Sequence, residues 1–92
     1  MESIDPAQIR SDLKRLIVRE LNLKNRDPET IEDDAALFGP GAVLGLDSLD
    51  ALQLAISIEE KLGVRIPEGD EVRAIFQSVR SIADHVVKMR SA

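Results

Sequence analysis

Residues 45–63 of this chain, GLDSLDALQLAISIEEKLG, decide its fold because they predict a helix at its centre. With about 100° between successive residues, one face of this segment is apolar enough to pack against a core. That face consists of Ala51, Leu54, Ala55, Ile58 and Leu62. The helix is expected to begin around Asp47 or Ser48 and to end at Leu62. Gly63 then suits the left-handed residue just past its end.

The same helix carries a second apolar stripe that a thin core does not need. It is formed by Leu49, Leu52 and Ile56 and is bordered by polar side chains. Two interpretations are open: a central helix buried over a wide arc, or an acid-rimmed apolar strip that docks on a partner. Composition does not choose between them. On the second interpretation the partner-binding residues are Asp50, Leu52, Gln53, Ile56, Glu59 and Glu60.

Further helices are expected on both sides of this segment. Apolar residues from Ile9 to Leu21 follow a helical period, and Asp5 and Pro6 suit the N-cap and the first helical position. Downstream, a short helix is expected after Asp70 as its N-cap, and a last helix from Ser78 onward. Their packing residues are Val72, Ile75 and Phe76 in the short helix and Val79, Ile82, Ala83, Val86 and Val87 in the last one.

The stretch from Asn22 to Gly45 shows no long helical period and is interrupted by Pro and Gly residues. A connection of this length in a compact domain needs a functional reason or anchors of its own. A short helical turn is expected near residues 35–38. The candidate anchors are the apolar residues of the loop, Ile31, Leu37, Phe38 and Leu44.

These elements predict an all-α fold. It is a small four-helix bundle of three longer helices and one short helix, with a long loop between helices one and two. The length of 92 residues suits a single domain over residues 1–92.

The composition excludes several functions. The chain has no Cys, which excludes a disulfide framework, a zinc ribbon and thiol chemistry from the polypeptide itself. Two Phe are its only aromatic residues, which argues against a deep aromatic-lined pocket. His85 is the only histidine and lies far from Ser48 along the chain, so a Ser-His-Asp set is not expected. No metal-ligand spacing is present either. The chain is therefore not expected to be an enzyme.

The net charge of −5 is unevenly distributed, since residues 27–71 hold twelve acidic and two basic residues. Nucleic acid needs a contiguous basic face, so it is not an expected partner. Basic protein surfaces are the expected partners of this acidic segment. Such a charge run can also be a solvated face kept for solubility. No apolar run is long enough to span a bilayer, and the start lacks a signal-peptide pattern. A cytoplasmic monomer without membrane contact is the expectation.

Ser48 allows two interpretations. A serine just before an apolar helical run is most often a plain N-cap. It would also be exposed at a helix N-terminus beneath a long loop, where free N–H groups and the positive end of the helix dipole favour a phosphate.

The frame Gly45-Leu46-Asp47-Ser48-Leu49-Asp50 resembles the phosphopantetheine attachment site of acyl carrier proteins. The resemblance extends from about Ile9 through Val87. It includes Leu37-Phe38 in the loop, Glu59-Glu60-Lys61-Leu62-Gly63 at the helix end, the link Val64-Arg65-Ile66-Pro67, and Ser78-Val79-Arg80-Ser81-Ile82 at the start of the last helix.

The resemblance implies a covalent 4′-phosphopantetheine that a phosphopantetheinyl transferase attaches to Ser48, with Asp47 and Leu49 beside it. It implies that Leu49 and Ile56 touch partner enzymes and that Asp50, Glu59 and Glu60 meet their basic docking patches. It further implies that Leu54, Ile58 and Leu62 line a cleft for an acyl chain. The function would be to present acyl thioesters to enzymes of fatty-acid, lipid or polyketide biosynthesis.

Three departures from the common pattern point to a specialised stand-alone bacterial carrier rather than the main fatty-acid carrier. They are Gln53 in place of a glutamate, Arg65 beyond the central helix, and the loop end Gly39-Pro40-Gly41-Ala42-Val43. A peptidyl or aryl carrier remains open. So does an unmodified helical adaptor that binds partners through Leu49, Leu52 and Ile56.

Overall fold

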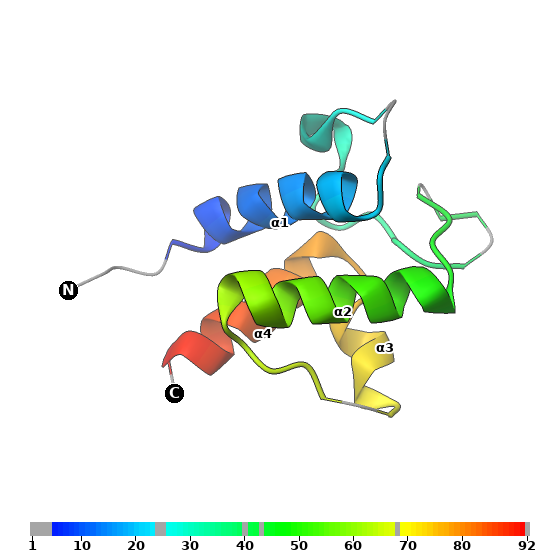
Figure 1. Ribbon diagram of the computed structural model, residues 1–92. Helices are drawn as coiled ribbons and strands as arrows, with labels where there is room; N and C mark the ends of the chain where they lie inside the picture. The colour runs from blue at the N-terminus through cyan, green and yellow to red at the C-terminus, as the bar shows by residue number, and fades with distance from the viewer. Residues whose placement is uncertain (1–4, 24–25, 40, 43, 68, 92) are drawn as a thin grey trace.

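The computed structural model describes residues 5–23, 26–39, 41–42, 44–67 and 69–91. The described residues form three long α-helices, one short α-helix and one turn of 3₁₀ helix (Figure 1). In chain order these are α1 (Pro6–Glu20), η1 (Pro28–Thr30), α2 (Ser48–Leu62), α3 (Glu71–Ile75) and α4 (Val79–Ser91). The all-α four-helix architecture expected from the sequence is confirmed.

Local capping explains most of the helix ends. Asp5 Oδ1 accepts from the backbone N–H of Ala7 at 3.0 Å, as an N-cap should. Gly63 ends α2 in the left-handed conformation with φ 68°, which suits a residue without a Cβ. Before α4, Ser78 Oγ accepts from the backbone N–H of Ser81 at 3.2 Å. The short helix follows Asp70 as expected, but Asp70 has helical dihedral angles and its side chain makes no capping hydrogen bond.

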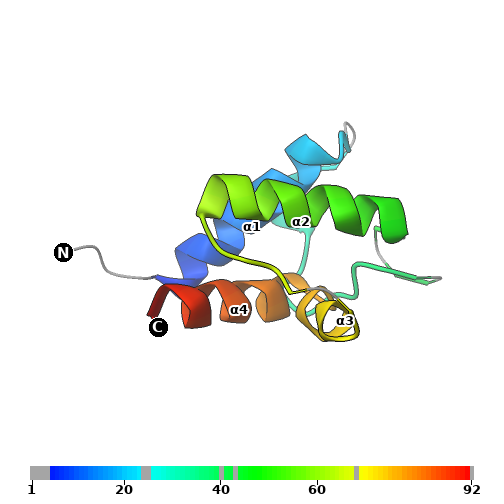
Figure 2. The same cartoon turned by 60° about the horizontal axis from the view of Figure 1, so that its bottom comes forward.

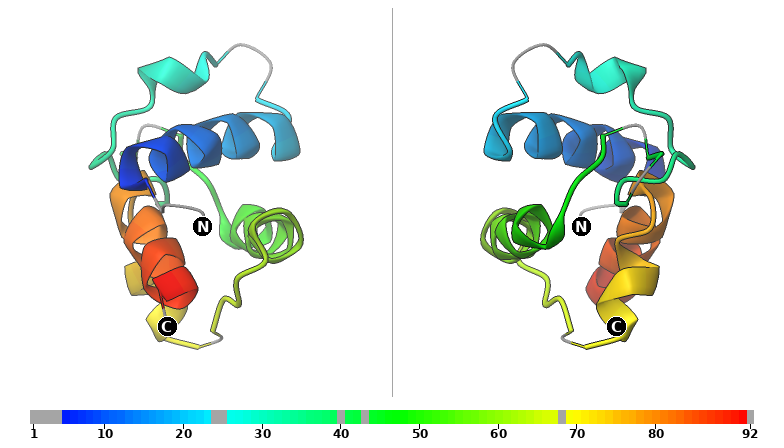
Figure 3. Two further views of the ribbon diagram at one scale, coloured as in Figure 1. Left: turned by 90° about the vertical axis from the view of Figure 1, so that its left-hand side faces the viewer. Right: turned by 90° about the vertical axis from the view of Figure 1, so that its right-hand side faces the viewer.

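The helices pack around one core. Helix α1 packs against both α2 and α4, and α3 packs against α4. Viewed along α2 and α4, these two helices lie on either side of the molecule beneath α1 (Figure 3). The core is almost entirely aliphatic, with residues from each long helix, including Leu13 and Ile17 of α1, Leu54 and Ile58 of α2, and Ile82 and Val86 of α4.

The long loop is held by its apolar residues and by the backbone. Ile31 and Leu37 are buried, and Phe38 and Leu44 are half-buried against the core, so all the expected anchors are confirmed. The helical turn expected at residues 35–38 is absent. Leu37 instead donates its N–H to Gln77 O at 3.1 Å and accepts from Leu46 N–H at 3.0 Å, while Phe38 and Leu46 form a parallel bridge. Pro40 and Val43 of the loop end lie outside the described residues.

An ionic cluster also joins the loop to the bundle. Asp33 lies 2.7 Å from Lys14 Nζ and 3.0 Å from Arg10 Nε, both on α1. The neighbouring Asp34 pairs with Arg80 Nε of α4 at 2.6 Å. The hydrogen bond from Lys14 is the main cause that lowers the pKa of Asp33 below its ordinary value, with Arg10 and Arg80 adding to it and partial burial opposing it. The acidic residues of this loop thus hold it in place.

The link after α2 brings α3 to the side of the site. Residues 64–67 lie outside any helix, and α3, which begins at Glu71, lies below the end of α2 that Ser48 begins (Figure 2). Glu59 and Ser57 tie α2 to its surroundings, since Glu59 Oε2 accepts from Ile66 N–H at 3.0 Å and Ser57 Oγ donates to Glu20 at 2.9 Å. Within the described ranges, no helix has the length and apolarity to cross a membrane.

Candidate functional site: Ser48 at the end of a groove

Ser48 occupies the first position of α2, and the residue before it is the cap. Asp47 Oδ1 accepts from the backbone N–H of Asp50 at 3.0 Å, and Asp50 Oδ2 accepts from the backbone N–H of Asp47 at the same distance. This reciprocal pair is a capping box. The N-cap interpretation of Ser48 is therefore wrong, because Asp47 is the N-cap of α2 and the Ser48 hydroxyl takes no part in the capping hydrogen bonds.

The Ser48 side chain is exposed. Among the described residues, no hydrogen bond to Ser48 Oγ occurs; the capping bonds at this helix end belong to Asp47 and Asp50. The N–H groups of Ser48 and Leu49 lie in the first helical turn, where an α-helix offers no acceptor of its own. The hydroxyl thus combines accessibility with a helix end that suits an anion.

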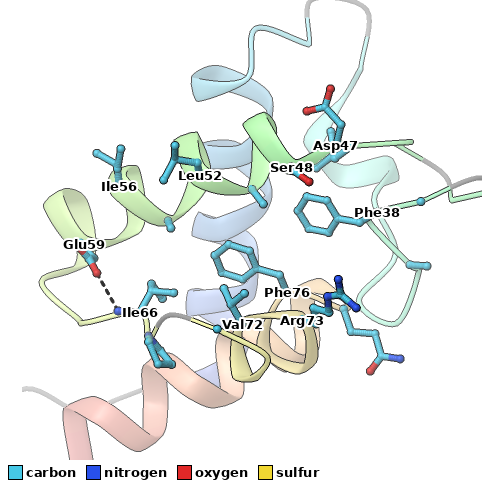
Figure 4. A pocket seen from close by; sticks show the side chains of 18 residues that line it. Phe38, Asp47, Ser48, Leu52, Ile56, Glu59, Ile66, Val72, Arg73 and Phe76 are labelled. Atoms are coloured by element: carbon cyan, nitrogen blue, oxygen red, sulfur yellow. Dashed lines mark hydrogen bonds between the residues drawn. The ribbon is translucent and has the colours of Figure 1, made fainter.

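A groove with a volume of about 1000 Å³ leads away from Ser48 between α2 and α3. Figure 4 shows Ser48 and Asp47 at one end of it and Glu59 and Ile66 at the other. Much of its lining is apolar, and the rings of Phe38 and Phe76 stack with centroids 6.1 Å apart. An extended apolar chain could lie along such a wall.

The groove is not lined by the residues expected from the family resemblance. Leu54 and Ile58 are fully buried in the core on another face of α2, and Leu62 packs against that core. The α2 side of the groove is instead formed by Ala51, Leu52, Ala55, Ile56 and Glu59. The small residues Ala51 and Ala55, four positions apart, leave the space. The sequence analysis placed both on the core face and missed the groove, although this spacing of small residues is a signal for it.

The second apolar stripe of α2 is exposed rather than buried. The exposed fractions are 76% for Leu49, 60% for Leu52 and 45% for Ile56. The described bundle leaves all three side chains exposed, so the wide-arc interpretation is wrong.

The polar residues beside this stripe differ in their bonding. Asp50 is engaged in the capping box, and Glu59 accepts the hydrogen bond from Ile66. Gln53 and Glu60 are exposed, and neither takes part in an ion pair or side-chain hydrogen bond within the described part of the chain. Of the three expected docking acids, Glu60 alone makes no ion pair or side-chain hydrogen bond to a described residue.

His85 lies apart from this site. It is on α4, does not line the groove, and its Nε2 is 2.8 Å from the carbonyl oxygen of Arg65, to which it can donate. Nor do the described residues bring three or more His, Asp or Glu side chains together in a metal-binding cluster.

The site suits a phosphopantetheine better than a reaction of its own. An exposed hydroxyl, a helix end that attracts an anion and a long groove match the three parts of that group: its ester linkage, its phosphate and its extended arm.

Comparison with known protein families shows which family has this kind of site. A family model described as phosphopantetheine attachment site matches residues 11–86. The chain belongs to this family. The resemblance to acyl carrier proteins, centred on the frame Gly45–Asp50, is thereby confirmed, and with it a covalent 4′-phosphopantetheine as the prosthetic group.

Curated relatives carry the name acyl carrier protein. One from Wolinella succinogenes is 32% identical and covers 77% of this chain and 88% of its own length. One from a Sulfurovum species is 34% identical over 70% of this chain and 76% of its own length. The mitochondrial acyl carrier protein 2 of Arabidopsis thaliana is 43% identical over 70% of this chain and 50% of its own length. This member of the family is a carrier and not an enzyme, and its family implies interaction with a phosphopantetheinyl transferase and with biosynthetic enzymes.

Proposed function

We propose that this chain carries acyl groups as thioesters on a 4′-phosphopantetheine linked to Ser48 Oγ, and presents them to enzymes of fatty-acid, lipid or polyketide-type biosynthesis. The observation that carries this proposal is the Ser48 hydroxyl itself. It is exposed at the first position of α2, outside the capping box and at the end of the groove. When bound, phosphopantetheine supplies the thiol that the polypeptide, which has no Cys, lacks.

The chain's own contribution at this site is positioning. Asp47 and Asp50 hold the first turn of α2 by reciprocal hydrogen bonds, and so hold the backbone of Ser48 at a defined place. Leu49, directly after Ser48, exposes its side chain beside the attachment point. Because no base is bonded to Ser48 among the described residues, its activation falls to the transferase, and this chain supplies access.

The exposed stripe of α2 is the proposed docking face. Leu49, Leu52 and Ile56 offer apolar contact area next to Ser48, with Asp50, Gln53, Glu59 and Glu60 at its border. Partner enzymes with basic patches would meet this border, and charge contacts at a rim mainly raise association rates. Such contacts are weakened by salt, which suits a carrier that must bind and leave repeatedly.

The remaining features of the proposal are a single acyl-carrier domain over residues 1–92, a monomeric state and a cytoplasmic location. Gln53 and Arg65 support a specialised pathway over the main fatty-acid pathway. Mass spectrometry of the species on Ser48 in the native cell identifies the cargo, and a common fatty-acid intermediate as the sole cargo would contradict the specialised pathway.

The attachment to Ser48 is tested with purified apo protein, coenzyme A and a phosphopantetheinyl transferase, by intact mass. We expect a gain of one phosphopantetheine in the wild type and none in Ser48→Ala. Ser11→Ala on α1 is the matched control and should be modified like the wild type. An unchanged wild-type mass with several competent transferases would contradict the proposal and favour the unmodified adaptor, and a modified Ser48→Ala would place the attachment elsewhere.

A further inference from the structure

Arg73 differs from the other residues that line the groove. It lies on α3, its side chain is exposed, and it is the one cation among the described groove residues. Across the described ranges no ion pair involves it; the paired cations are Arg10, Lys14, Arg15, Arg19 and Arg80. A guanidinium beside a largely apolar groove that makes no ion pair with a described residue is available for an anionic ligand.

The two acidic residues that line the groove, Asp47 and Glu59, form no ion pair with Arg73. Asp47 bonds to the backbone N–H of Asp50, and Glu59 bonds to the backbone N–H of Ile66 at the far end of the groove. Figure 4 shows Arg73 at the same end as Ser48, on the opposite wall. The free cation and the attachment serine thus face a common space.

The charges around Ser48 decide on which side an anion attached there would lie. Asp47 and Asp50 share the capping box at the start of α2, which holds two carboxylates near Ser48. Figure 4 shows the Asp47 carboxylate turned away from the space between α2 and α3. An added phosphodiester is a third negative charge in this neighbourhood, and like charges repel. Arg73 offers the opposite charge across the groove, so the field favours the groove side.

We propose that Arg73 binds the phosphodiester of the arm on Ser48 and thereby seats the arm along the groove between α2 and α3. This inference rests on the proposed attachment at Ser48. The guanidinium has paired donors that match phosphate oxygens, which makes arginine better suited to this contact than lysine. Arg73 is a positioning residue and takes no part in a covalent step.

The test compares apo and holo forms of the wild type, Arg73→Gln and Arg73→Lys by nuclear magnetic resonance. The observables are the ³¹P resonance of the arm and the Nε–H resonance of Arg73. We expect Arg73 Nε–H to shift on apo-to-holo conversion and the ³¹P resonance of Arg73→Gln to resemble that of the wild type in high salt. Arg73→Lys should lie between them. Arg65→Gln, which removes an exposed arginine outside the groove lining, is the matched control and should behave like the wild type.

A thermodynamic cycle gives a second readout. The stabilities of apo and holo protein, each with and without Arg73→Gln, isolate the coupling between the arm and Arg73 from any effect of the substitution on the fold. An exposed ion pair of ordinary strength corresponds to a roughly 1.5- to 5-fold change in the folding equilibrium.

The outcomes separate the two proposals. If intact mass shows no phosphopantetheine on Ser48, the proposed function fails and this inference with it. Only the role of Arg73 is overturned if Ser48 is modified but the wild-type Arg73 Nε–H does not shift on apo-to-holo conversion, and Arg73→Gln changes neither the ³¹P resonance nor the coupling in the cycle. A response of Arg73 seen only after loading with a carboxylate-bearing acyl group would likewise overturn it, and would assign Arg73 to the cargo.

Discussion

Replacing Asp47 separates its structural role from its electrostatic one. The Asp47 side chain accepts one 3.0 Å hydrogen bond from the N–H of Asp50, and its loss leaves that group to water. Loss of an N-cap acceptor costs about 1 kcal/mol, so Asp47→Ala should lower the free energy of unfolding by that amount. For a domain of this size the melting temperature should fall by about 4–8 °C. Asp47→Asn keeps an acceptor and should cost only a few tenths of a kcal/mol.

The assay is urea unfolding of the apo protein, followed by the initial rate of phosphopantetheine transfer at low and moderate salt. If the Asp47 carboxylate also meets the transferase, both variants should be modified roughly 1.5- to 5-fold more slowly, although Asp47→Asn loses much less stability than Asp47→Ala. The Ser11→Ala protein controls for substitution on a helix surface. Equal stability of Asp47→Ala and the wild type would refute the capping argument. A wild-type transfer rate for Asp47→Asn would confine Asp47 to a structural role.

Three further predictions address the loop, the core and the docking face. Asp33→Asn should lower the stability near neutral pH by roughly 1 kcal/mol, because Lys14 and Arg10 lose their partner. Since folding lowers the pKa of Asp33, the stabilisation is present at a pH above the ordinary pKa of an aspartate and is lost as the pH falls through the lowered pKa. Denaturation as a function of pH should therefore show a shallower acid decline in Asp33→Asn than in the wild type, and a parallel curve would contradict this. Leu54→Ala should destabilise the fold by about 2–5 kcal/mol, because Leu54 is fully buried, and Leu52→Ala by no more than about 0.5 kcal/mol, because Leu52 is exposed. The same urea experiment measures both. Equal effects would mean that the buried face of α2 is misassigned. Glu60→Lys should slow transfer or partner turnover more at low than at high salt without changing stability, and rates equal to the wild type would remove Glu60 from the docking face.

Glu60 is the better probe of docking because of how the other acids are bonded. Reversing the charge of Asp50 would break the capping box, and reversing that of Glu59 would release the backbone of Ile66. A slower reaction in those variants would mix lost docking with lost structure. The choice between the acids comes from the structure, since the sequence does not show which of them is hydrogen-bonded to the backbone.

Local features of the fold were predictable because short-range physics governs them. The helical period of residues 47–62, the N-cap at Asp5 and the left-handed Gly63 depend on neighbours within about one turn, and each is found as expected. Asp70 shows the limit of this reasoning, since an acid before a helix that short need not cap it. At the start of α2, Asp47 is the N-cap instead of the equally plausible Ser48, because Asp47 can form the reciprocal capping-box hydrogen bonds with Asp50 and Ser48 cannot.

The sequence by itself determined the number and order of the α-helices, and the motif around Ser48 pointed to the family, since these depend on local pattern. Only the tertiary structure decided which apolar stripe of α2 is buried, where the groove lies, and that Arg73 faces the space beside Ser48. Likewise, nothing in the local pattern around Asp34 pairs it with Arg80, 46 residues away. The physical reason is that a helix with two apolar stripes can bury either one, and the packing of α1, α3 and α4 around it makes the choice.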